Sequence, residues 1–213
     1  MQAKKAEQVI PRVRIAPSPT GPLHIGTARA ALFNYLFAKS QNGIFVLRIE
    51  DTDQERSSRQ WEENIVDGLK WLGLVWDEGP DPDNPEKEIG EYGPYRQSQR
   101  QETYKKHIQK LLDENKAYFC FCAKETLEAQ RQYQLSIGEA PHYPGTCREL
   151  GKEAIEENIK LNKPCVIRFK TPNKVFSYND LIKGKIEFNT SLFGDIAIAK
   201  GINAPLYNLA AVK

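Results

Sequence analysis

An eleven-residue segment between an apolar strand and an apolar helix limits what this chain can fold into more than any other segment. The segment Pro17–Thr27, PSPTGPLHIGT, follows Val13 and Ile15 and precedes a long helical pattern. Its prolines make a rigid turn, while Gly21 and Gly26 keep the backbone flexible. A helix N-terminus has unpaired N–H groups and the positive end of the helix dipole, which together favour phosphate. The segment therefore predicts a phosphate-binding turn.

His24 adds chemistry to this turn, in the sequence His-Ile-Gly. Its imidazole can donate a hydrogen bond to charge that develops on a leaving pyrophosphate. A motif of three residues also occurs by chance. The alternative interpretation is a proline-rich loop in which Thr20 caps the following helix.

The composition excludes several classes of protein. The chain of 213 residues has 30 basic and 28 acidic residues and a net charge of +2, so a nucleic-acid partner must be bound by local patches. No apolar run approaches the roughly 18 residues that span a bilayer, and residues 1–11 lack the apolar segment of a secretory signal. We expect a cytoplasmic protein without a membrane segment.

The first hundred residues alternate strand and helix patterns. We expect strands over 12–16 and 44–49 and helices over 24–40 and 58–72. The second strand is apolar without alternation, as in a central parallel strand that is buried on both faces. Phe33 and Phe37 lie off the main apolar face of the first helix and predict burial on two sides. The βαβ order predicts a parallel sheet that binds ligands at the carboxyl ends of its strands.

A proline- and acid-rich loop, from Glu78 to Pro94, marks a boundary, after which the composition changes to a smaller α+β unit. There we expect helices over 99–114 and 123–137 and β-segments over 165–170, 175–178, 185–189 and 195–200. The last eight residues, from Leu206 to Lys213, form an apolar run that predicts another strand.

Three carboxylates follow the second strand, in RIEDTD: Glu50, Asp51 and Asp53. Acidic residues at strand ends are costly unless they bind a ligand, a cation or a network of donors. The alternative is a solvated turn in which Asp53 caps the next helix. Arg14 points into the same crevice if its strand has the right register. There it forms either a structural ion pair with Glu50 or a fork for a substrate carboxylate.

Taken together, RVRIAPSPTGPLHIGTARAALFNYLFAKSQNG and the later RIEDTDQERS strongly resemble the bacterial-type glutamyl-tRNA synthetase family. The segments PYRQSQR, AYFCFC and GDIAIAK…PLYNLAAV resemble it in order and spacing, so the likeness extends from Val13 to Val212. The resemblance implies ATP-dependent activation of glutamate to glutamyl-adenylate and transfer to the 3′ end of tRNA-Glu. In that reaction the substrate carboxylate attacks the α-phosphate, so catalysis is positioning and charge stabilisation, with Mg²⁺ accompanying the ATP.

The resemblance also implies the architecture, which is an α/β fold. A Rossmann-like parallel-sheet catalytic domain of class I synthetases is split by an inserted α+β domain that binds the tRNA acceptor stem. Residues 9–98 then form the first half of the catalytic domain, 99–204 the inserted domain with a Cys-rich zinc-type segment, and 205–213 the start of the second half. The Lys-rich loop of the second ATP signature and the anticodon-binding region have no counterpart here. We therefore expect a fragment that does not aminoacylate alone.

The resemblance assigns two groups of site residues. The glutamate-binding positions are Arg14, Ala16, Ser18, Glu50 and Tyr207. Among them, Arg14 would face the side-chain carboxylate and Glu50 the α-amino group. The ATP-binding positions are Pro17, His24, Gly26 and Thr27, the last three being the catalytic motif.

The cysteine-rich segment indicates a metal site. Cys120 and Cys122 lie at a strand end, and Tyr143 precedes Cys147 by four residues. Two ligands from one hairpin and two from a later loop suit a tetrahedral zinc site. Some members of the wider family hold zinc in a Cys-x-Cys…Tyr-x-x-x-Cys arrangement, whereas others end in Cys-x-His, where this chain has Glu149. His142 is the other candidate for the fourth ligand.

The alternative for Cys120, Cys122 and Cys147 is that they are reduced thiols in a small core without metal. Cys165, on an apolar strand, is expected to be a core residue.

The implied partners are the acceptor end of tRNA-Glu, L-glutamate and ATP, and we expect a monomer. Basic residues before and along the helix over 99–114 either follow acceptor-stem phosphates or form a solvated face: Arg96, Arg100, Lys105, Lys106 and Lys110. Two alternative functions stay open. One is that of glutamyl-Q tRNA(Asp) synthetase, a shortened relative that attaches glutamate to a modified tRNA base. The other is a non-catalytic module that binds a nucleotide or RNA.

Overall fold

The computed structural model describes residues 10–53 and 55–212. The chain divides into two compact units, Met1–Arg100 and Gln101–Lys213. The division follows shortly after the proline-rich loop that marks the boundary in the sequence.

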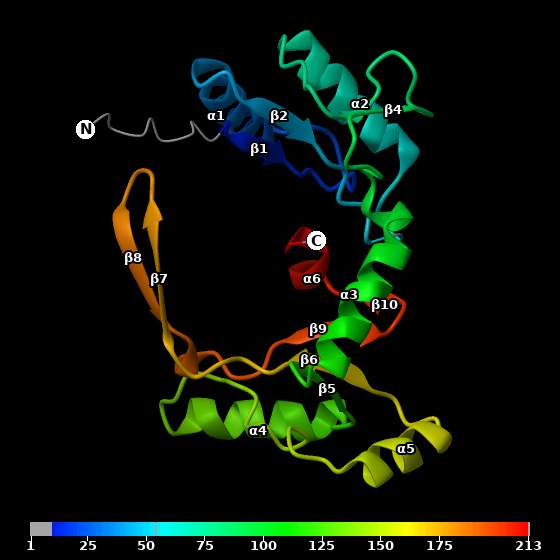
Figure 1. The fold of residues 1–213 in the computed structure, drawn as a ribbon, viewed down its shortest axis with the longest axis vertical. Coiled ribbons are helices and arrows are strands. Elements are labelled where there is room, and N and C mark those ends of the chain that lie inside the picture. The colour runs from blue at the N-terminus through cyan, green and yellow to red at the C-terminus, as the bar shows by residue number, and fades with distance from the viewer. Residues whose placement is uncertain (1–9, 54, 213) are drawn as a thin grey trace, which may run out of the picture. The chain divides into compact units, whose positions relative to one another are not determined.

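The first unit is built on parallel strands (Figure 1). Strand β1 (Arg12–Ile15) pairs in parallel with β2 (Ile44–Leu47), so that Arg14 lies opposite Val46. On its other side, β2 forms a parallel bridge between Val46 and Glu78. Just after β2, Ile49 forms a second parallel bridge with Arg96. The predicted central position of this strand is confirmed, and Phe45 and Leu47 are fully buried.

Two helices carry the core of the first unit. Helix α1 (Ile25–Ser40) buries Ala31 and Ala38, and helix α2 (Arg59–Trp71), capped by the Ser58 side chain, buries Ile65 and Leu69. These side chains pack with β1, β2 and Trp76 into one apolar cluster. Asp53 is therefore not the cap of α2, because the Ser58 hydroxyl accepts from the Trp61 N–H.

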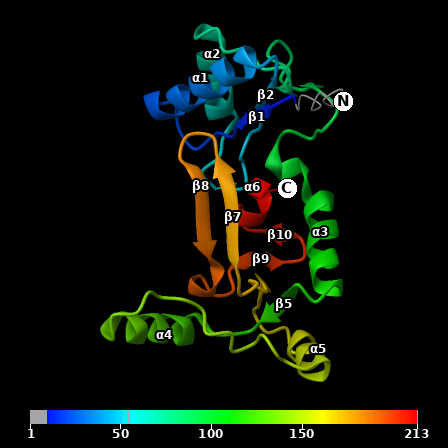
Figure 2. The ribbon, with the colours of Figure 1, turned by 60° about the vertical axis from the view of Figure 1, so that its left-hand side comes forward.

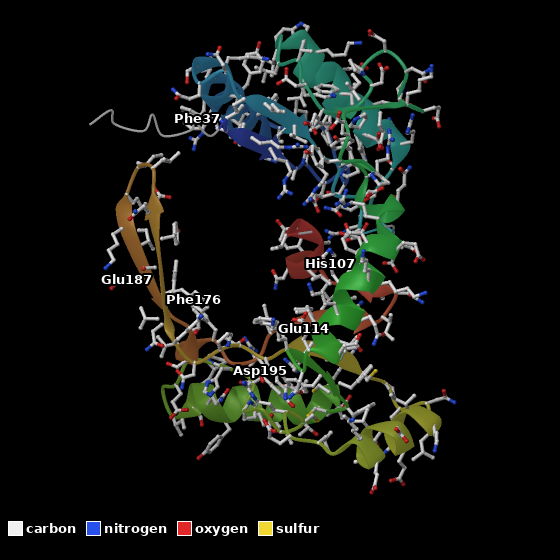
Figure 3. The ribbon with its side chains drawn as sticks, in the orientation of Figure 1. Phe37, His107, Glu114, Phe176, Glu187 and Asp195 are labelled. Atoms are coloured by element: carbon white, nitrogen blue, oxygen red, sulfur yellow. The ribbon has the colours of Figure 1, made fainter. Side chains whose placement is uncertain are left out.

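The prediction that α1 is buried on two sides is wrong for the residues described. Phe33 is 65% exposed and Phe37 is 37% exposed (Figure 3), while small alanines face the sheet. Close packing of α1 on β1 and β2 selects small side chains at that contact, so the large apolar residues occupy the other face.

The proline-rich loop contains more structure than the sequence predicts. Its short strands β3 (Gly79–Pro80) and β4 (Glu88–Ile89) pair with each other in antiparallel fashion. The Trp76 indole donates to the Pro80 carbonyl at 2.7 Å, which anchors the loop to the core. A short 3-10 helix, Gln97–Gln99, ends the unit.

The second unit has a four-stranded antiparallel sheet in the order β10-β9-β6-β5. Its strands are β5 (Ala117–Cys120), β6 (Val166–Phe169), β9 (Ala197–Gly201) and β10 (Ala204–Pro205). Helix α3 (Gln101–Asp113) contributes Ile108 to a core that also contains Ile167 and Ala199. Helices α4 (Lys124–Ser136) and α5 (Lys152–Lys160) bury no side chain, and the sequence analysis missed α5.

The end of the chain differs from the prediction. Residues Tyr207–Val212 form a helix, α6, and not a strand. Leu209 belongs to the core of the second unit, and Leu209 and Ala210 donate backbone hydrogen bonds to the Leu206 carbonyl. Alanine and leucine favour a helix once one face can be buried.

A two-stranded ribbon stands apart from the sheet of the second unit (Figure 2). It consists of β7 (Val175–Asp180) and β8 (Gly184–Asn189), and the short 3-10 helix Thr190–Leu192 follows. Tyr178 stacks on Phe188 across the ribbon with ring centroids 6.1 Å apart.

A buried carboxylate, Asp195, ties the segments of the second unit together (Figure 3). It is 3% exposed and accepts from Tyr118 Oη at 2.7 Å, Arg148 Nη1 at 2.6 Å and the Thr171 N–H at 2.8 Å. Burial and the hydrogen bond to Asp195 raise the pKa of Tyr118 well above its usual range. Both carboxylate oxygens are thus satisfied inside the fold.

Within the described parts of the chain, no helix combines the length and apolar character needed to cross a membrane.

Candidate functional site

His24 is the N-cap of α1. Its Nδ1 accepts from the Gly26 N–H at 3.1 Å, and its Nε2 lies 3.0 Å from Thr27 Oγ1. The alternative in which Thr20 caps this helix is therefore wrong. Because Nδ1 accepts from a backbone donor, Nε2 carries the hydrogen in the neutral ring. That N–H lies at hydrogen-bond distance from the Thr27 hydroxyl, so the two side chains form a linked pair of polar groups at the start of the helix.

The ring of His24 folds back over Gly26. A Cβ added at Gly26 would lie 3.0 Å from Cε1 and 3.1 Å from Nδ1 of His24, which is tighter than ordinary carbon contacts. A side chain at this position would therefore push the imidazole aside by a few tenths of an ångström.

A cavity of about 440 Å³ lies in front of this helix end. It is lined by residues of the turn, by the first turns of α1 and by one residue of α2: Ile15, Ala16, Pro17, Ser18, Thr20, Gly21, Pro22, Leu23, His24, Gly26, Thr27, Ala30 and Ile65. The structure thereby brings together six of the predicted site residues in one hollow. Free backbone N–H groups and the helix dipole at this end favour an anionic ligand.

Contacts with α2 hold the turn in place. The Leu23 N–H donates to Asn64 Oδ1 at 2.8 Å, and the Ser58 N–H donates to the Pro19 carbonyl at 3.0 Å. Leu23 also packs so closely on α2 that a Cβ at Gly68 would lie 2.6 Å from its Cδ2. The turn is therefore fixed at several points rather than free in solvent.

The three carboxylates after β2 have different environments. Glu50 is 3% exposed, and its N–H donates to the Pro17 carbonyl at 2.9 Å, so it lies beside the turn. Asp51 accepts from the Ser98 N–H at 2.8 Å and from Ser98 Oγ at 2.5 Å. Asp53 is half-buried, and its hydrogen bond from Arg56 holds its pKa below the usual value.

Arg48, and not Arg14, is the buried arginine beside Glu50. Its Nε and Nη2 donate to Glu50 Oε1 at 3.0 and 2.8 Å. Arg14 is exposed on β1 and does not line the cavity. The signal for Arg48 was present in the sequence, because residues two apart in an extended segment share a face.

Tyr207, the remaining predicted glutamate-binding residue, is the first residue of α6 in the second unit and is 64% exposed.

The cysteine cluster lies at the end of β5. The sulfur atoms of Cys120, Cys122 and Cys147 all lie within 4.8 Å of one another. The Tyr143 hydroxyl lies 3.4 Å from Cys120 Sγ and 3.5 Å from Cys122 Sγ, and it accepts from the Cys147 N–H at 2.9 Å.

These distances fit a tetrahedral zinc ion. Zn–S bonds of about 2.3 Å place two sulfurs about 3.8 Å apart, and a Zn–O bond of about 2.0 Å places oxygen and sulfur about 3.5 Å apart. Cys122 and Cys147 sulfurs are 3.6 Å apart. His142 is exposed instead, and its Nδ1 faces Gln134 Nε2 at 3.4 Å and the Ala140 carbonyl at 3.1 Å.

Arg168 supplies positive charge to the cluster. Its guanidinium lies 3.8 Å from the Tyr143 ring centroid. Burial opposes ionisation of Cys120, but hydrogen bonds from Tyr143 and Arg168 outweigh burial and lower the pKa of this thiol. Burial raises the pKa of Cys122 to about 11. Cys165 lies outside the cluster; it is half-buried just before β6, and burial raises its pKa.

Of the five basic residues considered for phosphate contacts, two are engaged within the first unit. Arg96 is buried and donates to Glu62, while Arg100 donates to the Pro94 carbonyl at 2.6 Å. The basic residues that α3 exposes are Lys105, Lys106 and Lys110. The two arginines thus belong to the packing of the first unit.

Comparison with known proteins places this geometry in a family. The sequence pattern of “tRNA synthetases class I (E and Q), catalytic domain” matches residues 11–212. The chain is 51% identical over 202 residues to the glutamate–tRNA ligase of Carboxydothermus hydrogenoformans and 53% identical over 203 residues to glutamate–tRNA ligase 2 of Caldanaerobacter subterraneus. Each alignment covers 94% of this chain and 41% of the relative. The chain therefore spans about two fifths of the length of these curated relatives.

Solved structures agree. A glutamate–tRNA ligase from Elizabethkingia meningosepticum, in complex with its amino acid, superposes with a TM-score of 0.81 at 39% identity, covering 94% of this chain and 40% of that one. A glutamate–tRNA synthetase from Elizabethkingia anophelis gives a TM-score of 0.83 at 38% identity, covering 95% and 41%.

Proposed function

The chain belongs to the class I tRNA synthetases for glutamate and glutamine, as part of their catalytic domain, and from this premise we propose that its protein is a glutamate–tRNA ligase. The relatives and solved structures with this name support the proposal. The structural observation that carries it is the position of buried Glu50 beside a cavity at the N-terminus of α1. A carboxylate suits the ammonium group of an amino acid, and a helix N-terminus suits phosphate.

The proposed reaction has two steps. A carboxylate oxygen of glutamate attacks the α-phosphate of ATP, which forms glutamyl-adenylate and releases pyrophosphate. A ribose hydroxyl of the terminal adenosine of tRNA-Glu then takes the glutamyl group and releases AMP. Neither step needs a nucleophile from the protein, so the site acts by positioning its substrates and by stabilising charge on phosphate oxygens.

The site residues divide between the two substrates. His24, Gly26 and Thr27, with Pro17, form the ATP side, where Nε2 of His24 lies 3.0 Å from Thr27 Oγ1. The family resemblance supports Ala16, Ser18 and Glu50 as glutamate-binding residues, with Arg14 for the distal carboxylate, and it assigns Tyr207 to the same substrate. Mg²⁺ accompanies the ATP and shields its phosphate charge.

The cysteine cluster is proposed as a structural zinc site with Cys120, Cys122, Cys147 and Tyr143 as ligands. Three thiolates and a phenolate around Zn²⁺ leave a negative site, and the stacked Arg168 compensates that charge. Metal analysis of the purified protein is expected to give one zinc per chain. Tyr143→Phe is expected to weaken zinc retention against a chelator, whereas His142→Ala is not; the reverse result would assign His142.

The second unit is proposed as the domain that binds the acceptor end of tRNA-Glu. Lys105, Lys106 and Lys110 on α3 are exposed and can contact phosphates. Their simultaneous change to Gln is expected to raise the KM for tRNA and to leave the KM for ATP unchanged.

Charging by the complete protein tests the proposed activity. Labelled glutamate, ATP and Mg²⁺ are supplied with purified tRNA-Glu, tRNA-Gln or tRNA-Asp in parallel reactions. We expect label on tRNA-Glu that is lost in His24→Ala and Arg14→Ala variants. Label on tRNA-Asp alone would identify a glutamyl-Q tRNA(Asp) synthetase, and no label on any tRNA would favour a nucleotide- or RNA-binding module.

A further inference from the structure

Glu50 is held through one of its two carboxylate oxygens. Oε1 accepts from Arg48 Nε at 3.0 Å, Arg48 Nη2 at 2.8 Å and Gln97 Nε2 at 3.0 Å. Gln97 is 1% exposed and Arg48 is 5% exposed, so these donors are themselves fixed by packing. Three donors on a single oxygen leave the carboxylate little freedom to rotate.

The second oxygen, Oε2, is buried without a hydrogen-bond partner. Among the described residues it is the one buried carboxylate oxygen in this condition. Burying a charged oxygen without a donor costs more than burying a neutral one. The fold therefore holds this oxygen ready for a donor that does not come from the described residues.

Two other buried carboxylates show that this arrangement is specific to Glu50. Asp195 has donors on both oxygens. Glu62 also accepts from an arginine on Oε1, with Arg96 Nε at 3.0 Å and Nη2 at 2.6 Å. Its Oε2 is not among the buried oxygens that lack a hydrogen-bond partner. The ion pair with Arg48 does not by itself explain why Glu50 Oε2 is buried without a hydrogen-bond donor.

The backbone ties Glu50 to the wall of the substrate cavity, behind the residues that line it. Its N–H donates to the Pro17 carbonyl, and Pro17 lines the hollow in front of α1. A substrate bound there can supply the missing donor. An ammonium group provides up to three N–H donors and a positive charge, which matches the unpartnered carboxylate oxygen.

We infer that Arg48 and Gln97 are positioning residues that direct Glu50 Oε2 at the α-ammonium of the amino-acid substrate and so set the selectivity for an amino group. This inference rests on the proposed function, because it takes glutamate as the substrate of this cavity. Arg48 and Gln97 act through Glu50 and touch no reacting atom. Their contribution is to the geometry and charge of the carboxylate.

Steady-state aminoacylation by the complete protein, with glutarate as a competitive inhibitor, tests the inference. Glutarate keeps both carboxylates of glutamate and lacks the ammonium group. Gln97→Met preserves size and removes the donor to Oε1, so we expect the KM for glutamate to rise about tenfold, as for loss of one buried hydrogen bond to a charged group. The Ki of glutarate should stay within about twofold, and kcat should not change, because the contact is equal in ground and transition states.

Arg48→Lys provides a second variant that keeps the positive charge and loses the two-point contact. It should raise the KM for glutamate by a smaller factor than Gln97→Met and again spare the Ki of glutarate. Glu62→Gln is the matched control, since it weakens an equally buried arginine–glutamate pair that does not face the cavity. It should change neither constant.

The possible failures are distinguishable. If the variants raise the KM for glutamate and the Ki of glutarate by the same factor, Arg48 and Gln97 are structural only and the inference is overturned. Unchanged constants in both variants overturn it equally. A wild-type protein that charges no tRNA with glutamate overturns the proposed function, and the inference with it.

Discussion

The first unit and the second unit are of similar length but are stabilised differently. The main cluster of the first unit contains eleven buried apolar residues, from Ile15 to Trp76, between two helices and parallel strands. The main cluster of the second unit contains six, and a separate small cluster is formed by Tyr118 and two cysteines. The second unit adds polar links, with Asp195 at their centre. Both units contain buried polar contacts, but the second unit has the smaller apolar cluster and so depends more on such contacts.

The largest difference between the units should follow removal of the proposed zinc. Structural zinc can contribute about 10 kcal/mol or more to a small domain. Cys147→Ala is expected to abolish zinc binding and to lower amide protection in β5 and β6 by orders of magnitude, measured by hydrogen exchange of the complete protein. Protection in β2 should not change. Cys165→Ala, outside the cluster, is the control, and equal losses in β2 and β5 would contradict the comparison.

Asp195→Ala should be the next largest effect. It leaves Tyr118, Arg148 and the Thr171 N–H without their acceptor, and loss of one partner of a buried charged pair costs about 3–5 kcal/mol. Urea unfolding monitored by hydrogen exchange in β6 should show the loss. Glu187→Ala removes an exposed carboxylate of the ribbon, paired with Lys185, and should cost less than about 0.5 kcal/mol. Similar costs for the two variants would refute the role given to Asp195.

Leu69→Ala tests the apolar core of the first unit, as Asp195→Ala tests the polar contacts of the second. Leu69 is fully buried on α2, and truncation of such a residue costs about 2–5 kcal/mol through lost transfer energy and a cavity. The three tryptophans of the chain, Trp61, Trp71 and Trp76, all lie in the first unit, so their fluorescence during denaturation reports on it. Leu72→Ala, at a position that is 43% exposed, should cost less than about 1 kcal/mol.

Tyr95 gives the smallest expected effect, at alkaline pH. Burial, and then its 2.6 Å hydrogen bond to Glu78, raise its pKa above the usual value. A folded-state pKa above the unfolded one means that the stabilisation is complete below about pH 10 and is lost as the pH rises through the folded-state pKa. Tyr95→Phe should cost about 1 kcal/mol at neutral pH and flatten the alkaline decline. Tyr92→Phe, at an exposed position, should do neither.

Much of the first unit was predictable from the sequence because its patterns are local. The strand–turn–helix order, the unbroken apolar run of β2 and the spacing of Ile65 and Leu69 each predict an element that the structure contains. The exposure of Phe33 was not predictable, because periodicity indicates which residues share a face and not what covers it.

The misses at the sites have similar reasons. The sequence suggested Arg14 as a possible ion-pair partner of Glu50, whereas the structure shows Arg48 in that contact. Two residues, Arg48 and Gln97, donate to Glu50 Oε1. Gln97 is distant from Glu50 in sequence, because it lies on a 3-10 helix after the proline-rich loop. The α6 helix was read as a strand because Leu-Ala-Ala-Val suits either state until packing decides.

The hydrogen bond by which His24 caps α1 orders this side chain when the helix folds, before a ligand binds. The imidazole is oriented by contacts with Gly26 and Thr27, which belong to the protein itself. Immobilising a free side chain on binding costs about 0.5–1.5 kcal/mol, and here that loss of freedom occurs during folding. An incoming ligand therefore meets an imidazole whose orientation is already set by Gly26 and Thr27. The affinity of this turn for its ligand is in part a property of the folding of α1.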